Sequence, residues 1–117
     1  MKVFSMKLLS LTLFIGFILA GCGNGNSATN VVKRYYAALA KGDAKTIGVV
    51  MTPQAAENLT PFMEKAKEHV TALGAITSTE ETIDGDTGVV TVSFENGDTE
   101  EIDVVLIDGK WRVSEWE

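Results

Sequence analysis

Between residues 31 and 73, hydrophobic positions recur every three to four residues. After Gly74 they alternate with polar positions. Val31 and Tyr35 begin a helical stripe that Lys41-Gly42 ends, and Asn30 stands immediately before it as a good N-cap. The spacing therefore predicts a first helix over residues 31–41.

Polar residues that precede a helical stretch mark the starts of the next helices. Asp43 can cap a short helix that runs to residue 50. Thr52-Pro53 and Thr60-Pro61 each place a proline in the first turn of a helix, where its missing N–H costs nothing. Two helices, over residues 53–59 and 61–73, are the simplest interpretation, and one helix kinked at Pro61 is the alternative.

The last of these helices has an apolar face and a glycine stop. Gly74 ends the periodic pattern. Four residues at helical spacing should line the face that packs on the core: Phe62, Ala66, Val70 and Leu73.

Beyond Gly74 the period becomes two, which is typical of antiparallel strands. Glycine-containing turns at Asp84-Gly85-Asp86, Asn96-Gly97 and Asp108-Gly109 divide this part of the chain. The predicted strands cover residues 76–83, 89–95, 100–107 and 110–116. The first of them is rich in threonine and polar, so we expect it at an edge of the sheet.

The parity of the apolar positions fixes the register of the hairpins. A two-residue turn at Asp108-Gly109 pairs Leu106 with Trp111, which brings apolar residues together on one face. The same turn at Asn96-Gly97 would set valines against acidic residues. A three-residue loop over residues 95–97, with a bulge at Gly97, instead pairs Val90 with Ile102, and we predict that loop.

The strands then share one apolar face that the helices must cover, which is an α+β architecture with helices packed on an antiparallel sheet of about four strands. Its predicted members are Val90, Val92, Phe94, Ile102, Val104, Leu106, Trp111 and Val113, with Trp111 near the sheet centre. No acid or histidine is expected in the middle of this face. Glu115 shares its parity but lies at the strand end, as a carboxylate at the rim.

The order of these motifs resembles the nuclear transport factor 2-like superfamily. The Gly42-Asp43 turn, the Thr52-Pro53-Gln54 helix start and the closing sequence DGKWRV (residues 108–113) carry the resemblance, which covers residues 30–116. More narrowly, the opening VVKRYYAALAKGDAKTI is similar to small bacterial lipoproteins with a domain of unknown function. The resemblance implies a cone formed by a curved sheet and the first helix, whose interior is either a small-molecule pocket or packed.

Enzymes of that superfamily include steroid isomerases and polyketide cyclases, which use an interior Asp or His as base and a Tyr or Asp as oxyanion donor. The predicted inward positions of this chain are Val, Ile, Leu, Phe and Trp. This departure favours a non-enzymatic domain. The alternative is an isomerase or hydrolase that uses His69 or a rim carboxylate as its base.

The first 21 residues have the layout of a signal peptide, with a basic start, an uncharged run and small residues before a cysteine. The apolar run is about 12 residues, short of the roughly 20 that span a membrane. Leu19-Ala20-Gly21-Cys22 closely resembles the lipobox of bacterial lipoproteins, which implies cleavage between Gly21 and Cys22 and a lipid on Cys22. We expect a signal peptide over 1–21, a lipidated tether over 22–29 and a domain over 30–117.

Charge and composition narrow the function classes. Lys2 and Lys7 are the basic residues before Cys22, so the rest of the chain has 8 basic against 16 acidic residues, a net charge of −8. Residues 80–117 carry 2 basic and 12 acidic residues, net −10, which excludes an electrostatic nucleic-acid binder. A single cysteine excludes a disulfide scaffold.

Candidate chemistry is sparse. The candidate pocket residues are Tyr35, Tyr36, Phe62, His69 and Trp111. His69 is the single histidine, so a solvated or rim position is its simplest interpretation. Trp116 has the opposite parity and is a candidate partner surface. Asp84, Asp86 and Glu95 match three positions of a calcium loop, but the glycine that such a loop needs is a valine here, so no metal is expected.

The sequence therefore predicts a lipid-anchored domain of a bacterial cell envelope that faces the periplasm or the exterior. It is expected to act as a binding or interaction module without a cofactor. The expected partners are the membrane, through Cys22, and either a small apolar ligand or an envelope protein.

Overall fold

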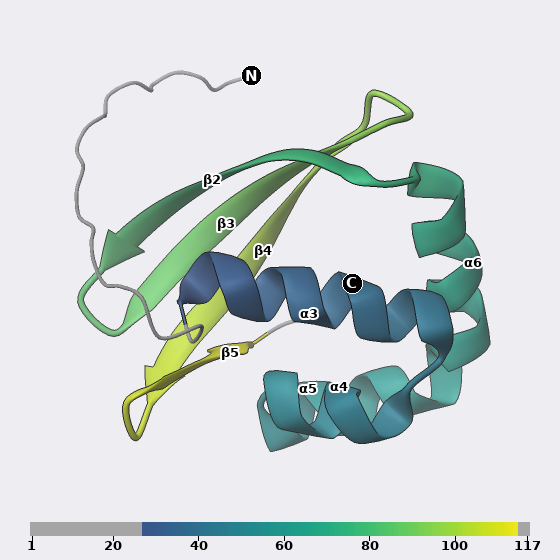
Figure 1. Ribbon diagram of the computed structural model, residues 1–117. Coiled ribbons are helices and arrows are strands. Elements are labelled where there is room, and N and C mark those ends of the chain that lie inside the picture. The colour runs from purple at the N-terminus through teal and green to yellow at the C-terminus, as the bar shows by residue number, and fades with distance from the viewer. Residues whose placement is uncertain (1–26, 115–117) are drawn as a thin grey trace.

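The computed structural model describes residues 27–114, and Figure 1 shows helices followed by a curved sheet. The described chain is α+β, as predicted. Its elements, in chain order, are α3 (Ala28–Lys41), α4 (Ala44–Val50), α5 (Pro53–Leu59), the 3₁₀ turn η3 (Thr60–Phe62), α6 (Met63–Leu73), β2 (Ile76–Asp84), β3 (Thr87–Phe94), β4 (Thr99–Ile107) and β5 (Lys110–Val113).

The first helix begins three residues earlier than predicted. Ser27, not Asn30, is the N-cap of α3, and its hydroxyl accepts a hydrogen bond from the backbone N–H of Asn30. The extra turn buries Ala28, which is 1% exposed. Because a serine hydroxyl caps as well as an asparagine and the added turn contributes core contacts, the earlier start is favoured. The segment expected as a tether therefore includes the first residues of α3.

The next helices start where the sequence predicts. Asp43 and Thr52 are the N-caps of α4 and α5, and each accepts a hydrogen bond from a backbone N–H in the first helical turn. The structure has two separate α-helices here, as the simplest interpretation predicts, and α5 has the predicted bounds. Pro61 lies in the η3 turn between them, so α6 begins at Met63 instead of residue 61. The prediction for Phe62 is wrong: the side chain lies in η3 and is 47% exposed instead of facing the core.

The sheet has the strand order β2-β3-β4-β5, with every neighbouring pair antiparallel. The β4–β5 hairpin pairs Leu106 with Trp111, as predicted. The β3–β4 hairpin pairs Val90 with Ile102, which confirms the three-residue loop. Its loop closes through hydrogen bonds from Phe94 N–H to the Asp98 carbonyl and from Gly97 N–H to the Phe94 carbonyl.

Two predictions about the last strand need correction. The strand β5 ends at Val113 instead of residue 116. It is an edge of the sheet, so Trp111 is partly buried and does not lie at the sheet centre. The first strand, β2, is the other edge, as predicted. Glu115 and Trp116, like Gly21 and Cys22, lie outside the described residues.

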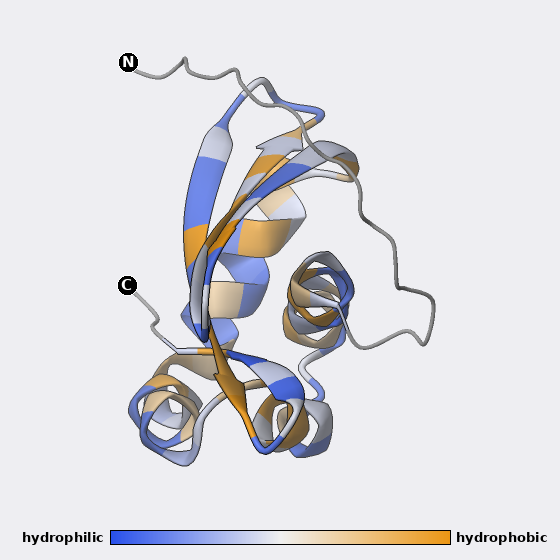
Figure 2. Cartoon of the chain, turned by 90° about the vertical axis from the view of Figure 1, so that its left-hand side faces the viewer, coloured by the Kyte–Doolittle hydropathy of each residue, from blue (hydrophilic) through white to orange (hydrophobic). Residues whose placement is uncertain are grey.

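The core lies between α3 and the face of the sheet that carries Val90, Val92 and Val104, called here the helix-covered face. Figure 2 looks along α3 and shows it beside that face. The buried core has no polar or charged residue within the described chain. The described core is thus apolar throughout, as the period-two pattern requires.

The α4–α5 junction is fixed to the edge strand β5. Met51 forms a parallel bridge with Val113, and the Thr52 N–H donates to the Val113 carbonyl at 2.9 Å. The Arg112 guanidinium donates to the Val49 carbonyl at 2.9 Å. These contacts hold the helices against one end of the sheet and leave the space between α3, α6 and β4 less filled.

Candidate functional site

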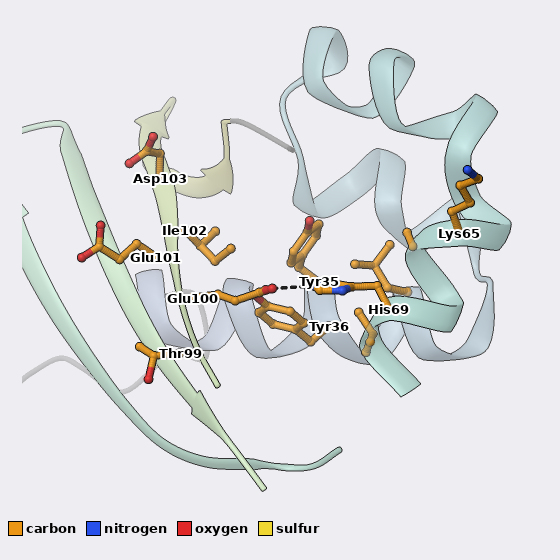
Figure 3. Close-up of a pocket in the computed structure, with 12 residues that line it drawn as sticks. Tyr35, Tyr36, Lys65, His69, Thr99, Glu100, Glu101, Ile102 and Asp103 are labelled. Atoms are coloured by element: carbon orange, nitrogen blue, oxygen red, sulfur yellow. Dashed lines mark hydrogen bonds and ion pairs between the residues drawn. The ribbon is translucent and has the colours of Figure 1, made fainter. Parts of the chain in front are cut away.

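A cleft of about 710 Å³ opens between α3, α6 and β4. Its apolar lining includes Leu39 from α3, Val70 from α6 and Ile102 from β4. The side chains that give it chemical character come from the same three elements: Tyr35, Tyr36, His69 and Glu100. Figure 3 shows the labelled residues of this cleft.

The carboxylate of Glu100 is the centre of a polar cluster. The Tyr36 hydroxyl donates a hydrogen bond to Glu100 Oε1 at 2.5 Å. His69 Nε2 lies 2.5 Å from the other oxygen, Oε2. One side chain of β4 therefore joins α3 and α6, and Figure 3 shows Glu100 extending from the strand toward both partners.

Strand alternation explains why Glu100 points into the cleft. It pairs with Val92 of β3 and has the same parity as Ile102 and Val104, so its side chain is on the helix-covered face. Glu101 and Asp103 have the opposite parity, and Figure 3 shows their side chains on the other side of the strand. The prediction excluded an acid from the middle of the apolar face, and Glu100 lies at its edge, near the start of β4. The predicted set of inward residues omitted it.

Glu100 could have been found from the predicted register. The three-residue loop that pairs Val90 with Ile102 also sets Glu100 opposite Val92, an inward position. The strand was expected to begin at this residue, and the predicted apolar face included Ile102 as its first member on this strand, so Glu100 was left out. An acid at an inward position needs hydrogen-bond partners, and the adjacent helices provide Tyr36 and His69.

The two tyrosine rings are almost completely buried. Tyr35 and Tyr36 are 3% and 4% exposed. Their rings pack edge to face with centroids 5.1 Å apart, and Tyr36 makes the same arrangement with Phe94. Burial is the largest cause that raises the pKa of both phenols far above the ordinary value, and the negative charge of Glu100 contributes to each; for Tyr36 the hydrogen bond to Glu100 adds to it. Both hydroxyls are therefore protonated at neutral pH.

The Tyr35 hydroxyl differs from that of Tyr36. It has no hydrogen-bond partner within the described residues, although Tyr35 lines the cleft. No fully buried side-chain oxygen or nitrogen in residues 27–114 lacks a partner. The Tyr35 hydroxyl is therefore not fully buried, and because Tyr35 lines the cleft it can donate or accept a hydrogen bond there.

His69 occupies the rim, where the sequence placed it. Its side chain is 59% exposed, whereas that of Glu100 is 27% exposed. His69 and Glu100 form a hydrogen bond whatever the charge of the imidazole, and they also form an ion pair when the imidazole is protonated. One face of the ring contacts solvent while Nε2 is held by the carboxylate.

Two of the five candidate pocket residues lie elsewhere. Phe62 and Trp111 are not among the residues that line the cleft. Phe62 is in η3, and Trp111 is on the edge strand β5. Tyr35, Tyr36 and His69 do line it. The lipidation and cleavage positions, Cys22 and Gly21, lie outside the described residues.

A second, shallower cleft of about 460 Å³ lies between α3 and β2 and shares Tyr36 with the first. Ala37, Ala40 and Ile76 give it a largely apolar lining. It contains no counterpart of the Glu100 cluster in its described lining. The larger cleft is the better candidate for a site because it combines apolar walls with convergent polar groups.

Within residues 27–114, no group of three or more His, Cys, Asp or Glu side chains is placed to hold a metal ion. None of the helices described is both long and apolar enough to cross a membrane.

Comparison with known proteins gives a likeness in structure. A scan against protein-family models finds no match, and a search of curated proteins finds none. A protein of Campylobacter jejuni, provisionally named an NTF2-like transpeptidase, has a similar structure with a TM-score of 0.53. The two chains are 18% identical, and the match covers 74% of this chain and 95% of that one.

Two further structures are more distant. A protein of unknown function from Mycobacterium tuberculosis is 17% identical with a TM-score of 0.42, over 73% of this chain and 64% of that one. A domain from Xanthomonas campestris, provisionally named a calcium/calmodulin dependent protein kinase II association domain, is 17% identical with a TM-score of 0.45, over 86% and 93%. Because both scores are below 0.5, no conclusion rests on these two.

At 18% identity the Campylobacter likeness concerns the fold alone. It agrees with the element order of this chain, in which helices precede a four-stranded antiparallel sheet and cover one of its faces. The chain has a nuclear transport factor 2-like fold.

Proposed function

We propose that this protein is a membrane-tethered, non-enzymatic domain that binds a small organic molecule in the cleft between α3, α6 and β4. The observation that carries the proposal is the combination of a cleft of about 710 Å³ with the Glu100 cluster and the unpartnered Tyr35 hydroxyl inside it.

The size and lining of the cleft support a small ligand. Ligand sites in proteins have volumes of about 300–1,000 Å³, apolar walls and a few well-placed polar groups. A protein-interaction module with a filled cone would not leave such a space next to a buried phenol. Leu39, Val70 and Ile102 can cover an apolar part of a ligand, and Tyr35 and Glu100 can orient a polar part.

The geometry favours binding over catalysis. His69 is the natural candidate for a base, but its side chain is 59% exposed at the rim. A catalytic electrostatic environment depends on excluding water from the reacting groups. Glu100 is engaged at both oxygens, which suits a rigid binding wall.

The second candidate function is a small-molecule isomerase or hydrolase. One observation favours it: Glu100 holds the imidazole of His69 in a fixed orientation, as carboxylates do for catalytic histidines. In that case replacing His69 should abolish turnover of a substrate while leaving its binding nearly unchanged.

The tether is proposed from the sequence. Leu19-Ala20-Gly21-Cys22 has the residues of a lipobox, and α3 begins at Ala28, a few residues later. A lipid on Cys22 would hold the domain at the surface of a bacterial envelope membrane. Stable anchoring takes two or more acyl chains, which a diacylglycerol provides.

The test is mass spectrometry of small molecules that the full chain retains when it carries Cys22→Ser and is purified without its lipid. We expect one compound in stoichiometric amount after acid release. Ile102→Trp should remove it because the new side chain occupies the cleft, where Ile102 points in Figure 3.

Val105→Trp is the matched control, since Val105 lies on the same strand with the opposite parity. It should retain the compound. If the unmodified cleft retains nothing, or if both tryptophan variants retain the compound equally, the ligand-binding proposal is wrong.

A further inference from the structure

Glu100 provides fixed negative charge inside the cleft. It is the one carboxylate of β4 on the helix-covered face, since Glu101 and Asp103 point to the opposite side. A carboxylate has about four acceptor positions, and one is used on each oxygen by Tyr36 and His69. Two acceptor positions are therefore free for a donor that enters the cleft.

Tyr35 provides the second polar group of the cleft. Its side chain is 3% exposed, and the hydrogen bonds found within residues 27–114 include none to its hydroxyl. Tyr35 and Glu100 line the same cleft, and the Tyr35 ring packs 5.1 Å from the ring of Tyr36, whose hydroxyl binds Glu100. A neutral phenol oxygen in the same cleft as a carboxylate can accept a hydrogen bond from the same donor group.

The cationic groups of the lining lie on another wall. His69 is at the rim on α6, and its Nε2 is already bound to Glu100. Lys65 is one turn before it on the same helix, and Figure 3 shows it apart from the Glu100 cluster. The part of the cleft next to the Glu100 carboxylate therefore favours a positively charged donor.

We infer that the ligand is an organic ammonium ion, with an N–H group donated to Glu100 and Tyr35 and an apolar body against Leu39, Val70 and Ile102. The inference rests on the proposed ligand-binding function and names the chemical class of its ligand. An ammonium group has three donors and no acceptor, which matches a site made of a carboxylate and a phenol oxygen.

Three six-carbon probes test the class directly: n-hexylamine in its ammonium form, hexanoate and 1-hexanol. They share one apolar body and differ in the head group. Each is titrated at neutral pH and low ionic strength into ¹⁵N-labelled protein that carries Cys22→Ser, and amide shifts are recorded. We expect saturable shifts at α3, α6 and β4, with hexylammonium bound at least about tenfold more tightly than the other two.

Matched variants separate the site from the general negative charge. Glu100→Gln should weaken hexylammonium binding at least about tenfold, and Tyr35→Phe about two- to tenfold. Glu101→Gln removes the same charge from the adjacent residue, which also borders the cleft but whose side chain points to the opposite side of the strand, and should weaken binding clearly less than Glu100→Gln. Tyr35→Phe keeps the inference testable if Glu100→Gln fails to fold.

The outcomes distinguish this inference from the function on which it rests. Equal or tighter binding of hexanoate or hexanol would mean that the cleft takes a ligand but not an ammonium ion. Equal losses in Glu100→Gln and Glu101→Gln would also overturn the ammonium site. If no probe gives saturable shifts, the inference fails together with the proposed binding function.

Discussion

The carboxylate of Glu100 lies where an apolar residue would be expected, and its two oxygens are satisfied by two different helices. Tyr36 donates from α3 and His69 contacts from α6. A carboxylate on the helix-covered face would destabilise the fold if it lacked partners. The hydration that the Glu100 carboxylate loses is offset by charge-assisted hydrogen bonds. These bonds also fix the distance between the walls of the cleft.

The two tyrosines allow a direct test of this cluster, because they are adjacent and similarly buried. Tyr36→Phe leaves Glu100 Oε1 without its donor and should lower the free energy of unfolding by about 1–2 kcal/mol. Urea denaturation measures the loss.

Tyr35→Phe is the control for that experiment. The hydrogen bonds found within residues 27–114 include none to the Tyr35 hydroxyl, so the free energy of unfolding should change by less than about 0.5 kcal/mol. A loss in Tyr35→Phe as large as in Tyr36→Phe would contradict the assigned hydrogen bonds.

The raised pKa values of the tyrosines predict how stability depends on pH. Burial favours the neutral phenol, so each folded pKa lies above the ordinary value of 10.0. This stabilisation is fully present below about pH 10 and is lost as the pH rises toward the folded pKa values. The free energy of unfolding should therefore fall steadily as the pH rises above about 10.

Denaturation at several pH values measures how the free energy of unfolding depends on pH, and absorbance at 295 nm measures the ionisation of the phenols. The double variant of Tyr35→Phe and Tyr36→Phe should show a weaker fall, because it lacks both buried phenols. Phenolate absorbance that appears with a midpoint near pH 10 in the folded protein would argue against burial of both hydroxyls.

At the scale of elements, two glycines in different surroundings predict opposite effects. A Cβ on Gly88 in β3 would lie 2.6 Å from Ile83 Cδ1 and 2.9 Å from the Thr82 carbonyl oxygen. Gly88→Ala should therefore destabilise by about 1–3 kcal/mol. A Cβ on Gly48, inside α4, would have nothing within 4 Å apart from the backbone of its own helix. Gly48→Ala should therefore stabilise the protein by about 0.5–1 kcal/mol.

Thermal unfolding of both variants checks the packing of the β2–β3 hairpin. Comparing the two variants is informative because each replaces a glycine with an alanine. If Gly88→Ala is as stable as the parent, the close approach of β2 to β3 at this position is not real.

Much of the element arrangement could be predicted because local chemistry determined it. Asp43 and Thr52 cap helices wherever the next residues are helical. The loop before Gly97 followed from parity, since a one-residue slip would turn every side chain to the wrong face. The start of α3 at Ser27 was missed because two good caps stand three residues apart and packing chose between them.

The site was less predictable because its contacts join residues far apart in the chain. Tyr36 and Glu100 are separated by 64 residues, and His69 and Glu100 by 31. Sequence pattern placed Tyr35, Tyr36 and His69 as candidates but gave no indication of which helix lies opposite β4. Phe62 was assigned to the core from its spacing, but Pro61 changed the geometry of that turn.

At the scale of the whole molecule, the position of α3 relative to Cys22 matters for the proposed anchoring. Residues 22–27 span at most about 20 Å when extended, which would keep the start of α3 near the membrane surface. Figure 1 shows α6, one wall of the cleft, toward the other end of α3. The cleft would therefore face away from the membrane and take its ligand from solution.

Cys22→Ser tests the anchor. The variant should leave the membrane fraction, move to the aqueous phase in detergent partitioning and lose the mass of the acyl chains, because the thiol that receives the lipid is absent. Ser27→Ala is a control near the same terminus that keeps the cysteine, and it should stay membrane-bound. Unchanged partitioning and mass in Cys22→Ser would mean that the protein is not a lipoprotein.

The central claim is that a small molecule occupies the cleft, and NMR amide shifts test it most directly. Protein with Cys22→Ser is compared as purified and after unfolding, dialysis and refolding, which removes a bound ligand. We predict shift differences around Tyr36, His69 and Glu100, and none on the outward face near Thr91 and Val105. Identical spectra, or differences confined to the outward face, would contradict the account.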